Sequence, residues 1–201
     1  MNVLFVCTGN TCRSPMAEAL LKQRAPAEMH VKSCGITAMP GAPASSQTTE
    51  VLRRQGIEIN HQASPISQEL VQWADLILTM TASHKEMVWA KYPEERKKIY
   101  TLKEFALHAD IQIWNELEKV YTELEEKRKR CLEQLDAEVD PIKQNQLLYE
   151  ACHEELETIH CLKSQLVHSD IADPFGGPAA YYLETKQEIE TCLNQWLSPE
   201  E

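Results

Sequence analysis

The chain has 201 residues, enough for one proper hydrophobic core with a small elaboration. Its 31 acidic and 20 basic side chains give a net charge of −11, which argues against nonspecific binding to nucleic acid. No apolar run approaches the roughly 20 residues that span a bilayer, and residues 1–6 lack the basic start of a signal peptide. We therefore expect a cytoplasmic protein that binds neither nucleic acid nor membrane.

The cysteines form an odd set of seven. A core of this size needs no disulfide bonds, so we expect reduced and mostly buried thiols, as in the cytosol. This expectation covers Cys34, Cys131, Cys152, Cys161 and Cys192. No two cysteines have the C-x2-C spacing of a zinc site, and no metal is expected.

The first hundred residues alternate between short apolar runs and amphipathic stretches. The expected strands are residues 2–6, 30–34, 75–80 and 98–102. The expected helices are residues 15–23, 45–55, 67–73 and 83–91. Such alternation predicts an α/β fold of three layers, in which a four-stranded parallel sheet carries helices on both faces. Ser14 is suited to cap the first helix, and Pro15 to occupy its first position.

Residues 110–168 replace this rhythm with a heptad pattern, in which apolar positions recur in steps of three and four. The first seam is formed by Trp114, Leu117, Tyr121, Leu124, Arg128, Cys131, Leu135 and Val139. After Pro141, a second seam is formed by Leu148, Cys152, Leu156, Ile159 and Leu162. We expect an inserted antiparallel helical hairpin, similar to a coiled coil, with arms of about 40 Å at ~1.5 Å per residue.

The insertion separates residues 1–108 from residues 169–201, which we expect to form one domain. The domain resumes with DPFGG at 173–177 and a final helix at 179–197. The seams can close on each other, cover the rim of a site or pair with another chain, so the hairpin is also a candidate for a protein contact. The basic cluster KRKR at 127–130 is expected to be a solvated helix face.

The stretch CTGNTCRS, residues 7–14, lies between the first strand and the first helix. Ligands bind at this edge of a parallel sheet, and the amides of Thr8 to Arg13 can converge on an anion of phosphate size. The positive end of the helix favours the thiolate of Cys7, and Arg13 offers a planar fork for two phosphate oxygens. Gly9 permits backbone angles that other residues avoid. The loop is therefore predicted to hold phosphate above a nucleophile.

C-x5-R alone is a weak signal, but a strand, CTGNTCRS and a helix that starts with proline are together specific. This combination resembles the low-molecular-weight protein tyrosine phosphatase family, whose motif is C-x-G-N-x-C-R-S-P at the N-terminus. The resemblance extends through SCG at 33–35, ADLILTM at 74–80 and the pair Asp173-Pro174. It covers residues 1 to about 108 and 169–197, and the helical insertion has no counterpart in the usual family pattern.

The resemblance implies a two-step covalent reaction that needs no metal or other cofactor. Cys7 would attack phosphorus and form a phosphocysteine, while Arg13 and the loop amides hold the charge of the transition state. Ser14 would hydrogen-bond the Cys7 thiolate. Asp173 would protonate the leaving group and later deprotonate the attacking water. Without the loop, an aspartate before proline would indicate only a turn.

Thr11 is the residue that points to a substrate. Tyrosine phosphatases of the family commonly carry a larger aliphatic residue there, whereas bacterial members that resemble protein arginine phosphatases carry threonine, together with DPFGG. The Thr11 hydroxyl could hydrogen-bond a guanidinium group, and Phe175 could form a wall against it; alternatively, Thr11 merely fits the loop. We expect phosphorylated proteins as partners, with phosphoarginine as the substrate group and phosphotyrosine as the alternative. The expected phosphate- and substrate-binding residues are Thr8, Gly9, Asn10, Thr11, Cys12, Arg13, Ser14 and Phe175.

The sequence argues against two other functions. Arsenate reduction on a similar fold relays a disulfide through two further cysteines, and residues 79–92 contain none. A non-enzymatic adaptor that works through the hairpin would not need Cys7, Arg13, Ser14 and Asp173 together.

Cys12 lies five residues after Cys7, close enough across a curled loop for a disulfide. A thiolate oxidised to sulfenic acid can be trapped by such a neighbour, so we expect reversible inactivation by peroxide; the alternative is a thiol that only packs the loop. Asn10 is expected to brace the loop, with help from Ser33. His84 and His61 are expected to be surface or capping residues rather than substrate contacts.

Overall fold

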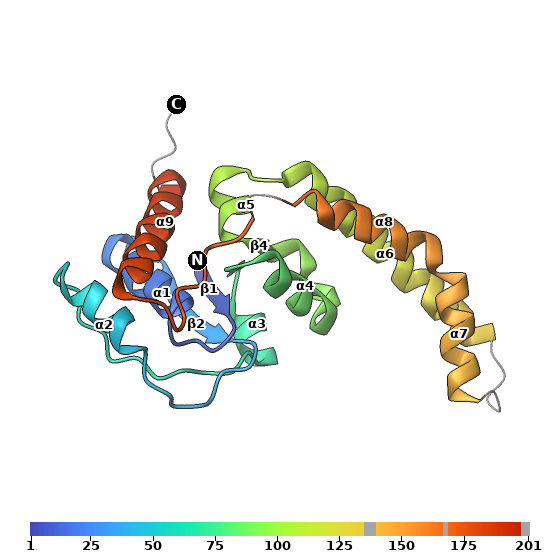
Figure 1. Ribbon diagram of the computed structural model, residues 1–201, viewed down its shortest axis with the longest axis horizontal. Helices are drawn as coiled ribbons and strands as arrows, with labels where there is room; N and C mark the ends of the chain where they lie inside the picture. Colours follow the sequence, from blue (N-terminus) through green and yellow to red (C-terminus); the bar gives the residue numbers. More distant parts are fainter. Residues whose placement is uncertain (135–139, 167–168, 198–201) are drawn as a thin grey trace. The chain divides into compact units, whose positions relative to one another are not determined.

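The computed structural model describes residues 1–134, 140–166 and 169–197. The chain divides into two compact units, Met1–Ala109 with the chain from His168 onward, and Asp110–Val167. Figure 1 shows a sheet between helices in the first unit and helices in the second.

The first unit is built on four parallel strands. They are β1 (Asn2–Cys7), β2 (His30–Gly35), β3 (Leu76–Thr79) and β4 (Ile99–Thr101). The strands lie in the order β2-β1-β3-β4, and each neighbouring pair is parallel. The central strands β1 and β3 are buried along almost their whole length, which is why both are continuous apolar runs in the sequence.

Helices cover both faces of this sheet (Figure 1). They are α1 (Arg13–Arg24), α2 (Ser46–Arg53), α3 (Gln68–Trp73), α4 (Ala82–Lys91), α5 (Leu102–Leu107) and α9 (Ala179–Leu197), with a 3₁₀ turn at Pro93–Lys98. Helix α1 packs on β1 and β2 and also contacts α9, whereas α4 packs on β3 and β4. The predicted three-layer α/β fold with a four-stranded parallel sheet is confirmed.

The strand order determines where a site can form. From β1 the chain continues to β2 on one side, and β3 lies on the other side, so the carboxyl end of β1 is a topological switch point. Cys7 is the last residue of β1. The amide of Ile171 donates to the carbonyl of Met80 at 2.8 Å, which brings the DPFGG segment to the end of β3. Residues far apart in the chain therefore meet at one edge of the sheet.

The predicted start of the first helix was wrong by two residues. Helix α1 begins at Arg13, and its N-cap residue Cys12 makes no capping hydrogen bond through its side chain. Ser14 is therefore inside the helix, where its hydroxyl hydrogen-bonds Cys7 and Asn10 instead of capping the backbone. Tertiary contacts within the loop override the local capping preference of serine.

Helix α5 was not expected, although the sequence carried a signal for it. Thr101 and Glu104 form a capping box, in which each side chain accepts a hydrogen bond from the other residue's backbone amide. The pattern T-x-x-E at 101–104 is typical of such a helix start. The strand predicted at residues 98–102 was therefore too long, because β4 ends at Thr101 and α5 begins at Leu102.

A buried ion pair connects α4 to α5. The Lys85 ammonium lies 2.8 and 2.6 Å from the two carboxylate oxygens of Glu104, and both side chains are almost fully buried. Lys85 also lies over the Trp89 ring, 4.5 Å from its centroid. The pair joins the two helices that follow β3 and β4.

Replacing Lys85 with methionine should lower the free energy of unfolding by about 3–5 kcal/mol, because the Glu104 carboxylate then stays buried without its partner charge. Urea unfolding followed by circular dichroism measures this loss. Arg53→Met is the control, since it removes an ion pair with Glu50 that is exposed on α2 and should hardly move the midpoint. Equal effects of the two substitutions would contradict the role of burial.

The second unit contains α6 (Ile111–Gln134), α7 (Pro141–Ala151) and α8 (His153–Ser164). Helix α6 packs against both α7 and α8. The second arm is not one continuous helix, because Cys152 separates α7 from α8 with backbone angles of −105° and 11°. In residues 1–134, 140–166 and 169–197, no helix is both long and apolar enough to cross a membrane.

The side chains between α6 and α8 differ in part from the predicted seams. Arg128 and Leu156 are exposed, whereas Lys127 forms an ion pair with Glu155 at 2.7 Å. Leu124 and Ile159 are buried as predicted. The contact thus includes a charged layer, in which Lys127 and Glu155 take the places expected for Arg128 and Leu156. The predicted seam residues Leu135 and Val139 lie outside the described residues.

Candidate functional site

The loop between β1 and α1 surrounds a cavity of about 190 Å³. The residues that line it are Cys7, Thr8, Gly9, Thr11, Cys12, Arg13, Asp173 and Phe175. Within the described part of the chain, the amides of Thr8 to Arg13 donate to no protein acceptor. Arg13 is the first residue of α1, and the first amides of a helix are likewise free to bind an anion. The loop and the DPFGG segment thus form one small site with unpaired donors.

The residue that bends the loop is Asn10 rather than Gly9. Asn10 has a φ of 56°, in the left-handed region that asparagine tolerates, while Gly9 has no positive φ. Gly35 allows the close approach of β2, because a Cβ there would lie 2.6 Å from the Thr8 carbonyl oxygen and 2.8 Å from the Asn10 amide. The second glycine of the loop region therefore comes from another strand.

Cys7 lies at the base of the cavity and contacts Ser14. Its Sγ is 2.9 Å from the Ser14 hydroxyl. Asn10 donates from Nδ2 to the hydroxyls of Ser14 at 2.9 Å and Ser33 at 2.8 Å. Ser14 therefore accepts from Asn10, and its own hydrogen can point to the sulfur or to the Cys34 carbonyl at 3.3 Å. This arrangement supplies a hydroxyl donor to a thiolate on Cys7.

The expectation that Asn10 braces the loop with Ser33 is confirmed, and two further groups complete the brace. The Ser33 hydroxyl donates to Glu18 on α1 at 2.5 Å. The His61 Nε2 lies 2.7 Å from the Asn10 carbonyl, so His61 is a bracing residue rather than a surface residue. Asn10 itself is fully buried.

Arg13 and Asp173 face each other across the cavity. The Arg13 Nη2 donates to the Asp173 carboxylate at 2.7 Å, and its Nη1 donates to the Ile171 carbonyl at 3.3 Å. Arg13 is buried, whereas the Asp173 side chain is half exposed. A buried guanidinium and a more accessible carboxylate therefore share the site with the Cys7 sulfur.

The DPFGG segment is held as a tight turn. The amide of Phe175 donates to the Asp173 Oδ1 at 3.2 Å, and Gly176 has a φ of 75°. A Cβ on Gly177 would lie 2.6 Å from the Tyr181 ring, so both glycines are needed for this turn. The Phe175 ring lines the cavity but is 75% exposed, which leaves it free to cover a substrate.

Thr11 and Cys12 form the other side of the cavity. The Cys12 Sγ lies 3.6 Å from the Ser45 hydroxyl and 3.7 Å from both the Tyr182 hydroxyl and the Thr11 hydroxyl. Burial raises the pKa of Tyr182, which keeps the phenol neutral beside this sulfur. The thiols of Cys7 and Cys12 are both free and line the same cavity.

His84 was expected to be a surface or capping residue, and the structure shows a different role. It is buried, with Nδ1 2.8 Å from the Thr81 hydroxyl and Nε2 2.9 Å from the Thr8 hydroxyl. Burial and then the charge of Arg13 lower the pKa of His84 to about 4, so the imidazole is neutral at neutral pH. The capping residue Thr81 indicates that His84 lies in the first turn of a helix. The contact of His84 with Thr8, however, depends on the pairing of β1 with β3.

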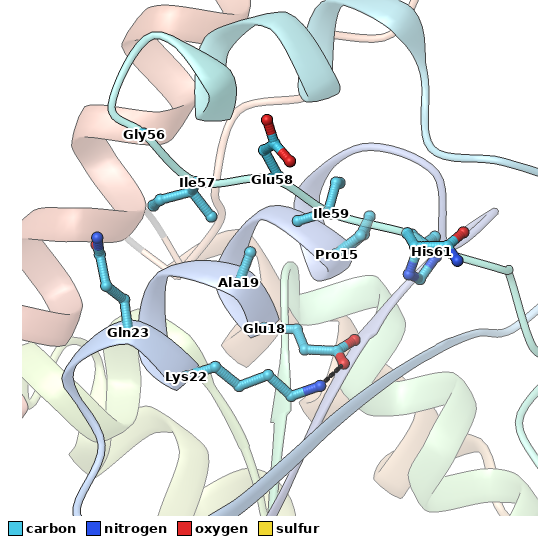
Figure 2. A pocket seen from close by; sticks show the side chains of 11 residues that line it. Pro15, Glu18, Ala19, Lys22, Gln23, Gly56, Ile57, Glu58, Ile59 and His61 are labelled. Atoms are coloured by element: carbon cyan, nitrogen blue, oxygen red, sulfur yellow. Dashed lines mark hydrogen bonds and ion pairs between the residues drawn. The ribbon is translucent and has the colours of Figure 1, made fainter.

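A second, larger cavity has a volume of about 460 Å³ (Figure 2). It is bounded by α1 and residues 56–61, and it carries the ion pair between Lys22 and Glu18. Its residues Glu18 and His61 are those that brace the Asn10 network from outside. It contains no cysteine, so the nucleophilic chemistry belongs to the smaller cavity.

A free thiol at the end of a central parallel strand, a loop of unpaired amides, a buried arginine and a facing carboxylate define a cysteine-dependent phosphatase. A family model described as "Low molecular weight phosphotyrosine protein phosphatase" matches residues 2–143. The chain belongs to this family and is a cysteine-dependent protein phosphatase.

Relatives that match most of the chain are described more narrowly. A protein-arginine-phosphatase of Bacillus subtilis (strain 168) is 39% identical over 198 residues, which cover 97% of this chain and 93% of the relative. A protein-arginine-phosphatase of Geobacillus stearothermophilus is 32% identical over 193 residues, covering 96% and 91%. The solved structure of the YwlE arginine phosphatase from Geobacillus stearothermophilus has a TM-score of 0.64 at 32% identity, and covers 96% of this chain and 88% of that chain.

Proposed function

We propose that this phosphatase hydrolyses phosphoarginine in proteins through a phosphocysteine on Cys7. The observation that carries the proposal is the single cavity that contains the Cys7 sulfur, Arg13, Asp173 and the Thr11 hydroxyl. Support also comes from the two protein-arginine-phosphatases that match this chain over nearly its whole length.

In the first step, the Cys7 thiolate attacks phosphorus and the bond to the leaving nitrogen breaks. The loop amides and Arg13 hold the three phosphoryl oxygens, which compete with Asp173 for the guanidinium. Released from Arg13, Asp173 takes up a proton from solvent and passes it to the leaving nitrogen. The arginine side chain departs and Cys7 carries the phosphoryl group.

In the second step, Asp173 accepts a proton from a water molecule that attacks the phosphocysteine. The sulfur–phosphorus bond breaks, inorganic phosphate forms and the Cys7 thiolate leaves. The Ser14 hydroxyl, 2.9 Å from the sulfur, stabilises that thiolate. One carboxyl group serves both steps because it leaves the first step ionised.

Peptides of one sequence that carry either phosphoarginine or phosphotyrosine test the substrate. We expect the higher kcat/KM on the phosphoarginine peptide. The family description favours phosphotyrosine as the second candidate, and a clear preference for that peptide would establish it instead.

Thr11→Ile should shift this preference toward the phosphotyrosine peptide by about tenfold or more. The substitution removes the hydroxyl that hydrogen-bonds the guanidinium group and adds apolar surface for a ring. The ratio of kcat/KM on the two peptides measures the shift. Thr49→Val on α2, outside the cavity, is the control, and an unchanged ratio in Thr11→Ile would refute the role of Thr11.

Peroxide is proposed to inactivate the enzyme reversibly through a Cys7–Cys12 disulfide, because both thiols line one cavity. Cys12→Ala should then lose activity irreversibly, since nothing traps the sulfenic acid before further oxidation. Activity after peroxide and then dithiothreitol measures the recovered fraction. Recovery as complete as in the parent enzyme would exclude Cys12 as the resolving thiol.

The second unit is proposed to be a coiled-coil-like insertion that contacts another protein. Its helix α7 has no buried residue and exposes Ile142, Leu147 and Tyr149. The free thiols favour a cytoplasmic location for the whole protein. Comparing the chain with a version that lacks residues 112–165, on both peptide types, separates a role in catalysis from a role in partner binding.

A further inference from the structure

A chain of three side chains connects the start of α4 to the first residue of the phosphate loop. The Thr81 hydroxyl caps α4 by accepting from the His84 amide at 3.1 Å, and lies 2.8 Å from the His84 Nδ1. On the other side of the ring, Nε2 lies 2.9 Å from the Thr8 hydroxyl. The imidazole is buried between two hydroxyls that belong to different loops.

A neutral His84 can share hydrogens with Thr81 and Thr8 in two ways, one for each tautomer of its ring. A neutral imidazole has one N–H and one acceptor nitrogen. Arg13 and Asp173 are the charged groups that act on this ring, with Arg13 the stronger of the two. When the Thr81 hydroxyl donates to Nδ1, the proton lies on Nε2 and is donated to the Thr8 oxygen. The hydrogen of the Thr8 hydroxyl is then available to the cavity that Thr8 lines.

We propose that His84 is a positioning residue that turns the Thr8 hydroxyl into an additional donor to the bound phosphoryl group. Six loop residues, Thr8 to Arg13, already contribute amides without protein acceptors. The Thr8 side chain adds a donor at the end of the loop nearest Cys7. This inference rests on the proposed function only in requiring a phosphoryl ligand, whether arginine or tyrosine carries it.

Binding of inorganic phosphate, measured by calorimetry, tests this arrangement without turnover of either peptide. Thr8→Val and His84→Leu should each weaken phosphate binding about tenfold, as expected for the loss of a hydrogen bond to a charged ligand. The double variant should bind no more weakly than either single variant, because both remove the same donor. Thr8→Ser, which keeps the hydroxyl, should bind as the parent enzyme does.

His84→Gln separates positioning from packing, because its amide can donate to Thr8 while its shape differs from imidazole. We expect it to restore most of the affinity lost in His84→Leu. Parent-like binding by Thr8→Val, or multiplied losses in the double variant, would overturn the inference. Since phosphate is the only ligand used, a failure here leaves the choice between phosphoarginine and phosphotyrosine untouched.

The helix pairing in the second unit independently indicates a second pair of thiols. Lys127 on α6 pairs with Glu155 on α8 at 2.7 Å, in the middle of the contact. Four residues after Lys127, one turn along the same face of α6, stands Cys131; three residues before Glu155 stands Cys152. Because α6 and α8 run antiparallel, both steps lead in the same direction and place the two cysteines in one layer.

The environments of these two cysteines differ in a way that suits stepwise oxidation. Cys131 is half-buried and lines a surface cavity together with Glu123, Lys127, Arg130 and Glu155, so peroxide can reach its sulfur from solvent. Cys152 is buried, and burial raises the pKa of its thiol, with Cys131 the next cause. The accessible thiol is therefore the first to react, and the buried one resolves it.

We infer that Cys131 and Cys152 form a disulfide when the protein meets peroxide. The Cys131 thiolate attacks one peroxide oxygen, the O–O bond breaks and hydroxide leaves, which gives a sulfenic acid. The Cys152 sulfur then attacks the Cys131 sulfur, so that a disulfide forms and water leaves with the proton of Cys152. The bond would fix α6 to the junction of α7 and α8.

Mass spectrometry of proteolytic peptides, after peroxide treatment of a Cys7→Ser, Cys12→Ser background, identifies the linked cysteines. We expect one dithiothreitol-sensitive peptide pair that contains Cys131 and Cys152, and a higher melting temperature of the oxidised protein. Cys131→Ser and Cys152→Ser should each abolish both effects, whereas Cys161→Ser, on the exposed face of α8, should keep them. Cys131 and Cys152 recovered unlinked, or linked to other cysteines, would overturn the inference.

Discussion

Cys7→Ser should reduce turnover of phosphoprotein by about 10⁴-fold or more, because a neutral hydroxyl replaces the thiolate that attacks phosphorus. Phosphate binding should persist in this variant, since Arg13 and the loop amides are unchanged. Steady-state kinetics on the phosphoarginine peptide and calorimetry with inorganic phosphate measure the two quantities separately. A large loss of kcat with little loss of phosphate affinity is the expected pattern.

The matched control for this prediction is Cys34→Ser. Cys34 is buried on the neighbouring strand β2, opposite Val6 of β1, and burial raises the pKa of its thiol well above the ordinary value. A thiol in that state does not act as a nucleophile, so Cys34→Ser should keep the turnover of the folded enzyme. Comparable activity of Cys7→Ser and the parent enzyme would remove the covalent mechanism.

Asp173→Asn should lower kcat by about 10²–10⁴-fold, because neither the leaving nitrogen nor the attacking water then exchanges a proton with this residue. The defect should depend on the leaving group. With p-nitrophenyl phosphate, whose leaving group needs no proton, the first step should stay fast. A burst of p-nitrophenolate equal to the enzyme concentration, followed by a slow phase, is therefore expected as phosphocysteine accumulates.

The control is Asp170→Asn, three residues earlier on the same segment. The Asp170 carboxylate accepts from the Ala82 amide at 2.7 Å at the start of α4 and does not line the cavity. This substitution should leave the kinetics free of a burst. If Asp173→Asn instead showed slow release of p-nitrophenolate from the first turnover, the proton-transfer role would have to be given to another group.

Local patterns in the sequence were sufficient to predict the strands of the sheet and the residues of the phosphate loop. Buried strands such as Asn2–Cys7 and Leu76–Thr79 are short apolar runs that no helical period could explain. The loop residues CTGNTCRS are contiguous, so their convergence depends on one strand, one turn and one helix start. Each of these is decided by residues next to one another in the chain.

Local patterns failed where a side chain had two competing partners. Ser14 is a good capping residue by type, but Asn10 and the Cys7 sulfur hold its hydroxyl inside the loop. His84 is a polar residue in the first turn of a helix, where exposure to solvent is expected, yet the pairing of β1 with β3 buries it against Thr8. In the second unit, Lys127 was expected to be solvated. It instead forms an ion pair with Glu155, in the contact between α6 and α8.

The sequence by itself determined the four strands along the chain, the nucleophile loop and the family, because these depend on short-range periodicity and contiguous motifs. Only the tertiary structure decided that Asp173 meets Arg13, that His84 contacts Thr8, and that Lys127 pairs with Glu155. Those meetings join residues separated by long stretches of chain, and they arise from strand order and helix register. Neither is encoded by any short segment alone, since each reflects the burial of many side chains at once.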